Sequence, residues 1–356
     1  MDDRYEIWGA ARRHAESGGR AALVTVCRRR GSLPMASDAK MFVAADGTRL
    51  GTVGGGCVEA DVAAQALDAA EQAVPAIVTH THTAESAGDI GLSCGGTADF
   101  FLEPVVSFPE MAELYGRVAQ AIRDRVPVAV YTAADWSGGP AKALEYSAGG
   151  PERHAGGEAR EGLKVGRIEQ LPSAETGLKP GQVTLFDEGA GVLVEFISRM
   201  PRVVIFGAGY VGLEIAKVAS GAGFYVVAID DREEFANPER IPWAQEVVAE
   251  DFRTALDRLT FDEDDYVLAT TRGHNFDAYI VERTAGSRAR YVGMLGSKRK
   301  RVVIGRALEA AGVPGHQLAR VKTPIGLDIG ADTPAEIAVS VVAELVKVRR
   351  RGERAQ

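Results

Sequence analysis

Cysteine is scarce in this sequence, with three residues in 356. Three cysteines cannot build a disulfide framework in a chain of this length, so we expect a cytoplasmic protein. No run of about 18 uncharged apolar residues is present, which argues against a membrane span. Positive charge is also in deficit, with 41 Lys and Arg against 49 Asp and Glu and a net charge of −8. A chain of this sign is not suited to coating nucleic acid or an anionic membrane.

The length predicts two domains, at roughly 150 residues per domain. Residues 198–201 form the most natural boundary, so we assign residues 1–199 to an N-terminal α/β domain of the α+β kind and residues 200–356 to a second domain. In the first domain the patterns predict a strand at 21–27, a basic loop at 28–38, a hairpin around 45–47, a helix at 58–74, strands at 76–81 and 98–102, and a long exposed loop or irregular hairpin at 137–162.

The second half alternates apolar strand patterns with helical patterns. The expected strands cover residues 203–206, 225–229, 266–270 and 291–295, and the expected helices cover 211–222, 253–259, 277–284, 298–311 and 334–350. Strands that alternate with helices indicate a parallel sheet covered on both faces. We therefore expect a Rossmann-like, doubly wound domain at 200–356.

The first turn of that domain carries a dinucleotide-binding fingerprint, with Gly207, Gly209 and Gly212 between a strand and a helix. The first glycine permits a sharp turn, the second lets the backbone approach a pyrophosphate, and the third lets helix and strand pack closely. The helix N-terminus then faces the phosphates. Asp230 or Asp231, about twenty residues on, can accept hydrogen bonds from a ribose. A degenerate Rossmann domain that binds nothing is the alternative.

Two further positions in this half each allow two interpretations. His274, with Asp277, follows a predicted strand end, where open parallel sheets place ligand sites, so it either contacts a ligand or stabilises the loop. The run Lys298–Arg301 opens a predicted helix, where cations oppose the helix dipole. An anionic ligand or an acidic partner would offset that cost, and a solvated face is the alternative.

Two cysteines lie between glycines. Cys57 follows Gly55 and Gly56 at the start of a predicted helix, where the dipole and free N–H groups favour a thiolate. Cys94 precedes Gly95 and Gly96 in a second glycine-rich stretch. No Cys-x-x-Cys pair exists, so structural zinc is disfavoured, and the two thiols indicate soft-metal ligation, persulfide carriage or nucleophilic chemistry. Ordinary burial as a small apolar side chain is the alternative, and it is our expectation for Cys27.

These motifs together resemble those of the XdhC/CoxI family, over residues 20–105 and 200–348. In the first half the matching stretches are Arg30-Gly31-Ser32, Ala39-Lys40-Met41, Gly54–Glu59, Gly91–Gly96 and Phe101-Leu102-Glu103-Pro104. In the second half they are Gly207–Gly212, Asp230-Asp231-Arg232, Tyr291–Lys300 and Pro324–Ala338. The chain departs from the family pattern at Tyr210 and Arg272, where the family often has histidine.

The resemblance implies an accessory factor for xanthine dehydrogenase and related molybdenum hydroxylases. Such a factor is a cofactor-binding chaperone rather than a stand-alone enzyme: it binds the molybdopterin-based molybdenum cofactor, holds it while a cysteine desulfurase supplies sulfur, and passes it to the apo-enzyme. Cys57 and Cys94 match the motif cysteines, so the resemblance makes them candidates for contact with molybdenum or a transferred sulfur.

Two other functions stay open at this stage. The glycine fingerprint alone favours an NAD(P)-dependent oxidoreductase, although no clear hydride-transfer constellation accompanies it. A non-enzymatic regulator that senses a nucleotide is the second alternative. We expect the glycine-framed cysteines and the phosphate-binding turn to serve one anionic ligand, and a homodimer is the favoured state because ligand sites often lie where domains meet.

Overall fold

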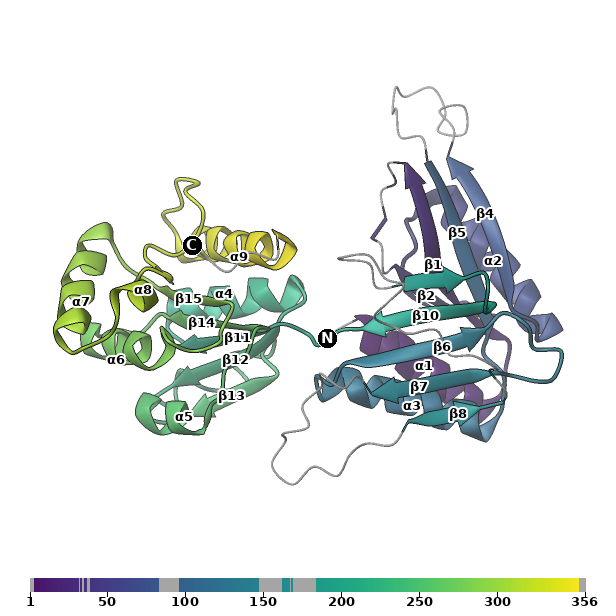
Figure 1. Ribbon diagram of the computed structural model, residues 1–356, viewed down its shortest axis with the longest axis horizontal. Coiled ribbons are helices and arrows are strands. Elements are labelled where there is room, and N and C mark those ends of the chain that lie inside the picture. The colour runs from purple at the N-terminus through teal and green to yellow at the C-terminus, as the bar shows by residue number, and fades with distance from the viewer. Residues whose placement is uncertain are drawn as a thin grey trace. The chain divides into compact units, whose positions relative to one another are not determined.

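The computed structural model is shown in Figure 1. It describes residues 3–31, 33, 35–36, 39–82, 96–146, 162–166, 168 and 184–351. The chain divides into two compact units, Met1–Arg199 and Met200–Gln356. Within the described residues, no helix has the length and apolar character that crossing a membrane requires.

The first unit combines two antiparallel sheets with three helices in its described part. One sheet has the order β3-β2-β1-β5-β4 and the other the order β8-β7-β6-β10-β9. The strands of the first sheet are β1 (Ala21–Gly31), β2 (Lys40–Ala44), β3 (Arg49–Gly51), β4 (Ala76–His82) and β5 (Gly96–Pro104). Those of the second are β6 (Val128–Ala133), β7 (Lys142–Tyr146), β8 (Leu163–Val165), β9 (Thr184–Asp187) and β10 (Val192–Ile197). The helices are α1 (Asp3–Ser17), α2 (Gly56–Gln72) and α3 (Pro109–Arg123).

Strand β1 is buried on both faces, which explains its continuous apolar run. Leu23 packs into a core shared with α1 and α3, whereas Val24 and Val26 pack into a second core under α2. Alternate side chains of a strand point to opposite faces, so one strand supplies both cores. The second core holds helix α2 against the first sheet. Cys57 lies in the first turn of this helix.

One expectation for this unit was wrong. Residues 28–31 are not loop, because β1 continues to Gly31 and pairs with β5 from Asp99 to Gly96. For residues 137–162 the structure excludes a single exposed loop and favours the hairpin alternative, because β7 pairs antiparallel with β8 and Lys142 in β7 is fully buried. Burial of this lysine depends on Glu103 of β5, whose carboxylate lies 2.7 Å from the ammonium. Tyr115 donates a second hydrogen bond to Glu103 at 2.9 Å.

The second unit has a six-stranded, fully parallel sheet of order β13-β12-β11-β14-β15-β16 in the described residues. Its strands are β11 (Arg202–Phe206), β12 (Tyr225–Asp230), β13 (Glu246–Ala249), β14 (Asp265–Ala269), β15 (Tyr291–Met294) and β16 (Val321–Lys322). Its helices are α4 (Tyr210–Gly221), α5 (Phe252–Arg258), α6 (His274–Thr284), α7 (Lys298–Ala310), α8 (Gly315–Leu318) and α9 (Pro334–Arg351).

Helices cover both faces of this sheet. One core joins the sheet to α4 and α9, and the other joins it to α5, α6 and α7 (Figure 1). This confirms the predicted doubly wound, Rossmann-like fold. The strand order reverses between β11 and β14, and in open α/β sheets the crevice at such a point receives ligands. The loops after β11 and β14 are therefore the candidate site of this unit.

Candidate functional site

Cys57 is exposed in the first turn of α2. The turn that leads to it holds Gly54, Gly55 and Gly56 at φ values of 127°, 75° and 68°. Residues other than glycine rarely adopt this backbone conformation. A Cβ added at Gly55 or Gly56 would meet no heavy atom of the described residues within 4 Å. Open space thus borders the backbone on the N-terminal side of the thiol, as the sequence predicts.

Glu59 organises this turn. Its Oε2 atom accepts hydrogen bonds from the backbone N–H groups of Val53 at 3.0 Å and Gly55 at 3.1 Å, and from the Thr52 hydroxyl. Burial raises the pKa of Glu59, but these three hydrogen bonds outweigh that effect and hold the pKa below its usual value. The carboxylate therefore stays charged and fixes the glycine turn, while the thiol two positions earlier stays free for a ligand.

Cys94 and Gly95 lie outside the described residues. Gly96 opens β5 and pairs with Gly31 of β1, and a Cβ there would lie 2.7 Å from the Arg30 carbonyl oxygen. Its missing side chain thus permits close packing of two strands.

Strand β4 runs antiparallel to α2. The strand begins just after the helix ends, and the His80 ring lies 3.3 Å from the Gln65 side-chain amide.

Cys27 and His80 of this unit have structural environments. Cys27 is buried, as predicted, and its thiol donates to the Asp99 carbonyl oxygen at 3.3 Å. Burial raises the pKa of Cys27 to about 12. His80 lies 3.5 Å from the Asp61 carboxylate and stacks edge-on against Phe100. No group of three or more potential metal ligands occurs among the residues that the structure describes.

In the second unit the glycine turn has the predicted geometry. Gly207 has φ 103°, and its N–H donates to the Ile229 carbonyl at 2.8 Å. A Cβ at Gly212 would lie 2.0 Å from the Gly207 carbonyl oxygen, so only glycine lets α4 begin so close to the turn. Gly209, in contrast, caps α4, and a Cβ added there would meet no heavy atom within 4 Å in the part of the chain that the structure describes. This is the position at which a phosphate could approach the backbone.

Asp230, one of two candidate ribose acceptors, is buried and engaged inside the unit. Its Oδ2 atom accepts from the Ala208 N–H at 2.8 Å, which ties the carboxylate to the glycine turn. Both oxygens also accept from the Arg232 guanidinium, at 2.9 and 3.2 Å. The guanidinium stacks on the Phe235 ring, 3.6 Å from its centroid. A ribose could reach this carboxylate only by displacing Arg232.

Asp231, the second candidate acceptor, is paired with Arg272 from the loop after β14. Two parallel hydrogen bonds of 2.8 Å join the guanidinium to the carboxylate. Burial raises the pKa of Asp231, but the hydrogen bonds and charge of Arg272 outweigh it and hold that pKa below its usual value. Arg272 occupies a position where the family often has histidine, and here it bridges the ends of β12 and β14.

Helix α6 presents a second N-terminus at this edge of the sheet. Gly273 caps it without a side-chain hydrogen bond, as Gly209 does for α4, and His274 is exposed at its first position. The hydrogen bonds that stabilise the loop come from buried Asp277, which accepts from the Thr271 hydroxyl at 2.7 Å and pairs with Lys300. His274 is thus accessible to a ligand, and Lys300 is committed to the protein.

Sequence reasoning missed Arg272 and Arg240 as structural elements of this edge. Arg240 donates to the Ala208 carbonyl oxygen and to that of Phe235, at 3.1 Å in the second case, and so braces the glycine turn. The run Asp230-Asp231-Arg232 offered a signal for one pairing. The Arg272 and Arg240 contacts join positions 41 and 32 residues apart, and no local pattern indicates them.

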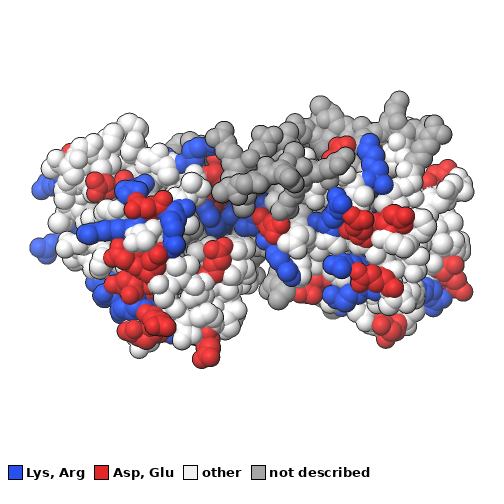
Figure 2. All heavy atoms as spheres, turned by 90° about the horizontal axis from the view of Figure 1, so that it is seen from below, with Lys and Arg blue, Asp and Glu red and all other residues white. Residues whose placement is uncertain are grey.

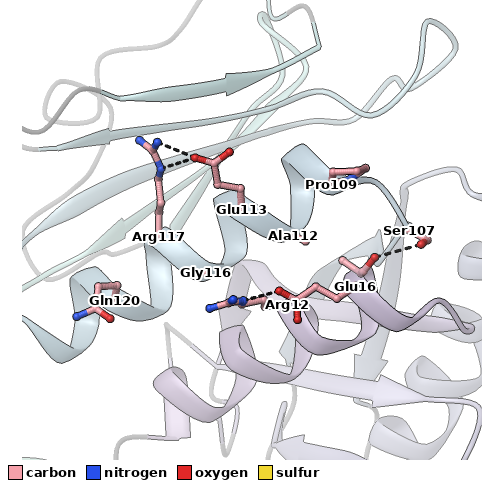
Figure 3. Close-up of a pocket in the computed structure, with 10 residues that line it drawn as sticks. Arg12, Glu16, Ser107, Pro109, Ala112, Glu113, Gly116, Arg117 and Gln120 are labelled. Atoms are coloured by element: carbon pink, nitrogen blue, oxygen red, sulfur yellow. Dashed lines mark hydrogen bonds and ion pairs between the residues drawn. The ribbon is translucent and has the colours of Figure 1, made fainter.

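A groove of about 750 Å³ lies elsewhere in the first unit, between α1 and α3 (Figure 3). Its charged side chains are paired along their own helices, Arg12 with Glu16 at 2.8 Å and Arg117 with Glu113 at 2.7 Å. Its described lining includes none of the candidate cysteine or glycine positions. Figure 2 shows Lys and Arg interspersed with Asp and Glu on the face that it presents. Two regions therefore remain as candidate sites. We call residues 54–59 the Cys57 turn, and we call the loops after β11 and β14, with Gly207, Gly209, Gly212 and Gly273, the glycine edge.

Comparisons with known proteins agree with the motifs. A family model described as the XdhC Rossmann domain matches residues 203–345, and one described as the XdhC and CoxI family matches residues 14–81. A Bacillus subtilis protein, named as a probable xanthine dehydrogenase subunit, is 25% identical over 351 residues, covering 93% of this chain and 94% of that protein. An uncharacterized Escherichia coli protein, YqeB, is 36% identical over 163 residues, which are 45% of this chain and 30% of that protein.

A solved structure has the same fold over its whole length. It is a crystal structure described as a xanthine dehydrogenase from Bacillus halodurans, with a TM-score of 0.75 and 25% sequence identity. The match covers 100% of this chain and 98% of that one.

Proposed function

Because this chain belongs to the XdhC and CoxI family, we propose that it is an accessory factor of a xanthine dehydrogenase-type molybdenum hydroxylase. The relatives named after xanthine dehydrogenase support this role. In the proposal the chain binds the molybdenum cofactor as cargo, holds it while a cysteine desulfurase supplies its sulfido ligand, and delivers it to the apo-enzyme.

The observation that carries the proposal is the exposed thiol of Cys57 in a glycine turn held by Glu59. A thiolate is a soft ligand that suits transferred sulfur and can also ligate a metal. The thiol needs access and a backbone that a bulky ligand can approach, and Gly55 and Gly56 provide both. Gly95 and Cys94 belong to the proposed site through their motif alone.

The glycine edge of the second unit supports binding of the anionic part of such a ligand. Helices α4 and α6 both begin there with glycine caps, which supply no side-chain hydrogen bond to the first backbone N–H groups of the helix. Helix N-termini favour phosphate groups through these N–H groups and the helix dipole. We propose that Gly207, Gly209 and Gly212 shape this phosphate site and that His274 lies at its border.

An NAD(P)-dependent oxidoreductase is the competing function, and the fingerprint itself favours it. The engagement of Asp230 by Arg232 and of Asp231 by Arg272 weighs against it. A nicotinamide dinucleotide normally donates its ribose hydroxyls to such a carboxylate. A ligand with a phosphate and no need of that contact, such as a pterin cofactor, fits this edge better.

Cysteine variants test the proposal directly. A molybdenum hydroxylase co-produced with the Cys57→Ala chain should contain less molybdenum than the same enzyme co-produced with the unmodified chain. Cys27→Ala is the matched control, because it removes a thiol that is buried in the core. Equal molybdenum content with both variants, each verified as folded by circular dichroism, would remove Cys57 from the proposed function.

A further inference from the structure

Helix α7 concentrates positive charge in a chain that is acidic overall. Lys298, Arg299, Arg301 and Arg306 are exposed on it, and Glu309 is the one acidic residue within the helix. In the described part of the chain none of these four cations has an ion pair or hydrogen-bonded side-chain partner. Lys300 differs, because its ammonium pairs with Asp277 and donates to the Leu295 carbonyl oxygen at 2.8 Å.

Fold stability does not account for these four cations. Other surface arginines of the same unit have partners, such as Arg283 with Asp257 and Arg272 with Asp231, each at 2.8 Å. Three of the unpaired cations lie in the first turn of α7, where positive charge opposes the helix dipole and costs stability. Charged residues that lower the stability of a helix and gain no compensating contact within the fold indicate a functional surface.

The same face of α7 also exposes apolar surface. Val302 is 51% exposed and Val303 is 61% exposed. Arg299, Val302, Val303 and Arg306 follow the spacing i, i+3, i+4 and i+7, which places them along one stripe of the helix. Two valines thus lie between two unpaired arginines. This is the charge and shape pattern of a protein docking face, since interfaces have apolar centres and polar rims.

A groove of about 390 Å³ adjoins this stripe, between α7 and the α8–β16 segment. Val302 and Arg306 line it together with Arg301 and Gly305, and its floor is apolar, from Ile304, Leu308 and Leu318 among others. The helix lies beside α6 and α8 in Figure 1. The groove and the stripe therefore form one continuous surface on the second unit, which we call the α7 surface.

We propose that the α7 surface docks an acidic, partly apolar segment of the molybdenum hydroxylase that this chain serves. We choose this occupant because of charge complementarity. The four unpaired cations favour carboxylates on the partner, and the two valines and the groove favour apolar side chains that lie between those carboxylates. Complementary charges of this kind steer association and suppress wrong partners. The partner's identity rests on the proposed function, whereas the surface rests on α7 itself.

Binding of the cofactor-free hydroxylase to variants of this chain tests the surface. Arg299→Glu/Arg306→Glu should weaken the affinity roughly tenfold or more, with most of the loss disappearing at high salt, because charged rims act mainly on the association rate. Val302→Ser/Val303→Ser should weaken it by faster dissociation. The matched control is Arg350→Glu/Arg351→Glu, which makes the same charge change at the exposed end of α9 and should bind like the unmodified chain.

Three results would overturn the assignment of the α7 surface as a docking site. They are unchanged affinity in both α7 variants, an equal loss of affinity in the α9 control, and no binding of the hydroxylase by the unmodified chain. A change of oligomeric state in the α7 variants, measured by sedimentation, would assign the surface to a second copy of this chain instead and also overturn it. Pterin retention distinguishes failure of the α7 surface from failure of the proposed function. The α7 variants should keep bound pterin while they lose affinity for the hydroxylase, whereas an unmodified chain without pterin would contradict the proposed function.

Discussion

Glycines 209 and 212 lie three residues apart in one turn, and the structure predicts opposite consequences for their replacement by alanine. At Gly212 the new Cβ would be 2.0 Å from the Gly207 carbonyl oxygen, whereas real Cβ contacts stay beyond 3.0 Å. The start of α4 and the turn must therefore separate by about 1 Å. Overpacking of this kind typically costs about 1–3 kcal/mol.

At Gly209 the same methyl group meets no heavy atom within 4 Å, and φ of −62° suits alanine. A weaker helix cap and a less flexible unfolded chain nearly cancel, so we expect Gly209→Ala to change the unfolding free energy by less than about 0.5 kcal/mol. The methyl group would nevertheless occupy the place where a phosphate approaches the backbone. Gly209→Ala should therefore lose ligand while keeping stability, and Gly209→Val should abolish binding.

Hydrogen exchange of the amides in β11 and β14 measures the stability of this unit without interference from the other one. We expect faster exchange in Gly212→Ala and unchanged exchange in Gly209→Ala, with bound pterin measured on the same samples. Equal stability of the two variants would refute the packing role of Gly212. Full pterin retention in Gly209→Ala would refute the phosphate role of the turn.

Two predictions concern the first unit. Glu103→Gln should lower its unfolding free energy by about 3–5 kcal/mol, because the buried Lys142 ammonium loses its charged partner, while exposed Glu113→Gln should cost at most about 0.5 kcal/mol in the same urea titration. Burial raises the pKa of Cys27 from 9.0 to about 12, so the contribution of this thiol to stability should fall by up to about 4 kcal/mol as the pH rises from 9 to 12. Cys27→Ala should flatten that fall, and an identical pH profile would contradict the assignment.

The fold of the second unit was predictable because its signals are local. Each buried strand is a continuous apolar run, each helix has its own period, and the fingerprint needs only Gly207, Gly209 and Gly212. The short strand β13 and the segment α8–β16 were not predicted, since their residues are few and partly exposed. Their positions depend on the sheet that they join.

The site and the first unit depend more on contacts between distant residues. Strand β7 contains a lysine and follows a glycine-rich stretch, so its sequence indicates a loop. Lys142 becomes compatible with burial through its ion pair with Glu103, 39 residues earlier. Asp230 has the position of a ribose acceptor in the sequence, whereas the structure shows that Arg232, packed on Phe235, donates hydrogen bonds to both of its oxygens. The position of Cys57 at a helix start was predictable because the helical pattern and the glycines are adjacent in the sequence.

The identity of the small molecule that the chain carries is the most direct test of the account. The protein should be purified from a host supplied with molybdenum, oxidised, and its released ligand examined by fluorescence and chromatography. The account predicts a fluorescent pterin. Release of a nicotinamide nucleotide in its place would contradict it and assign the glycine edge to a dehydrogenase.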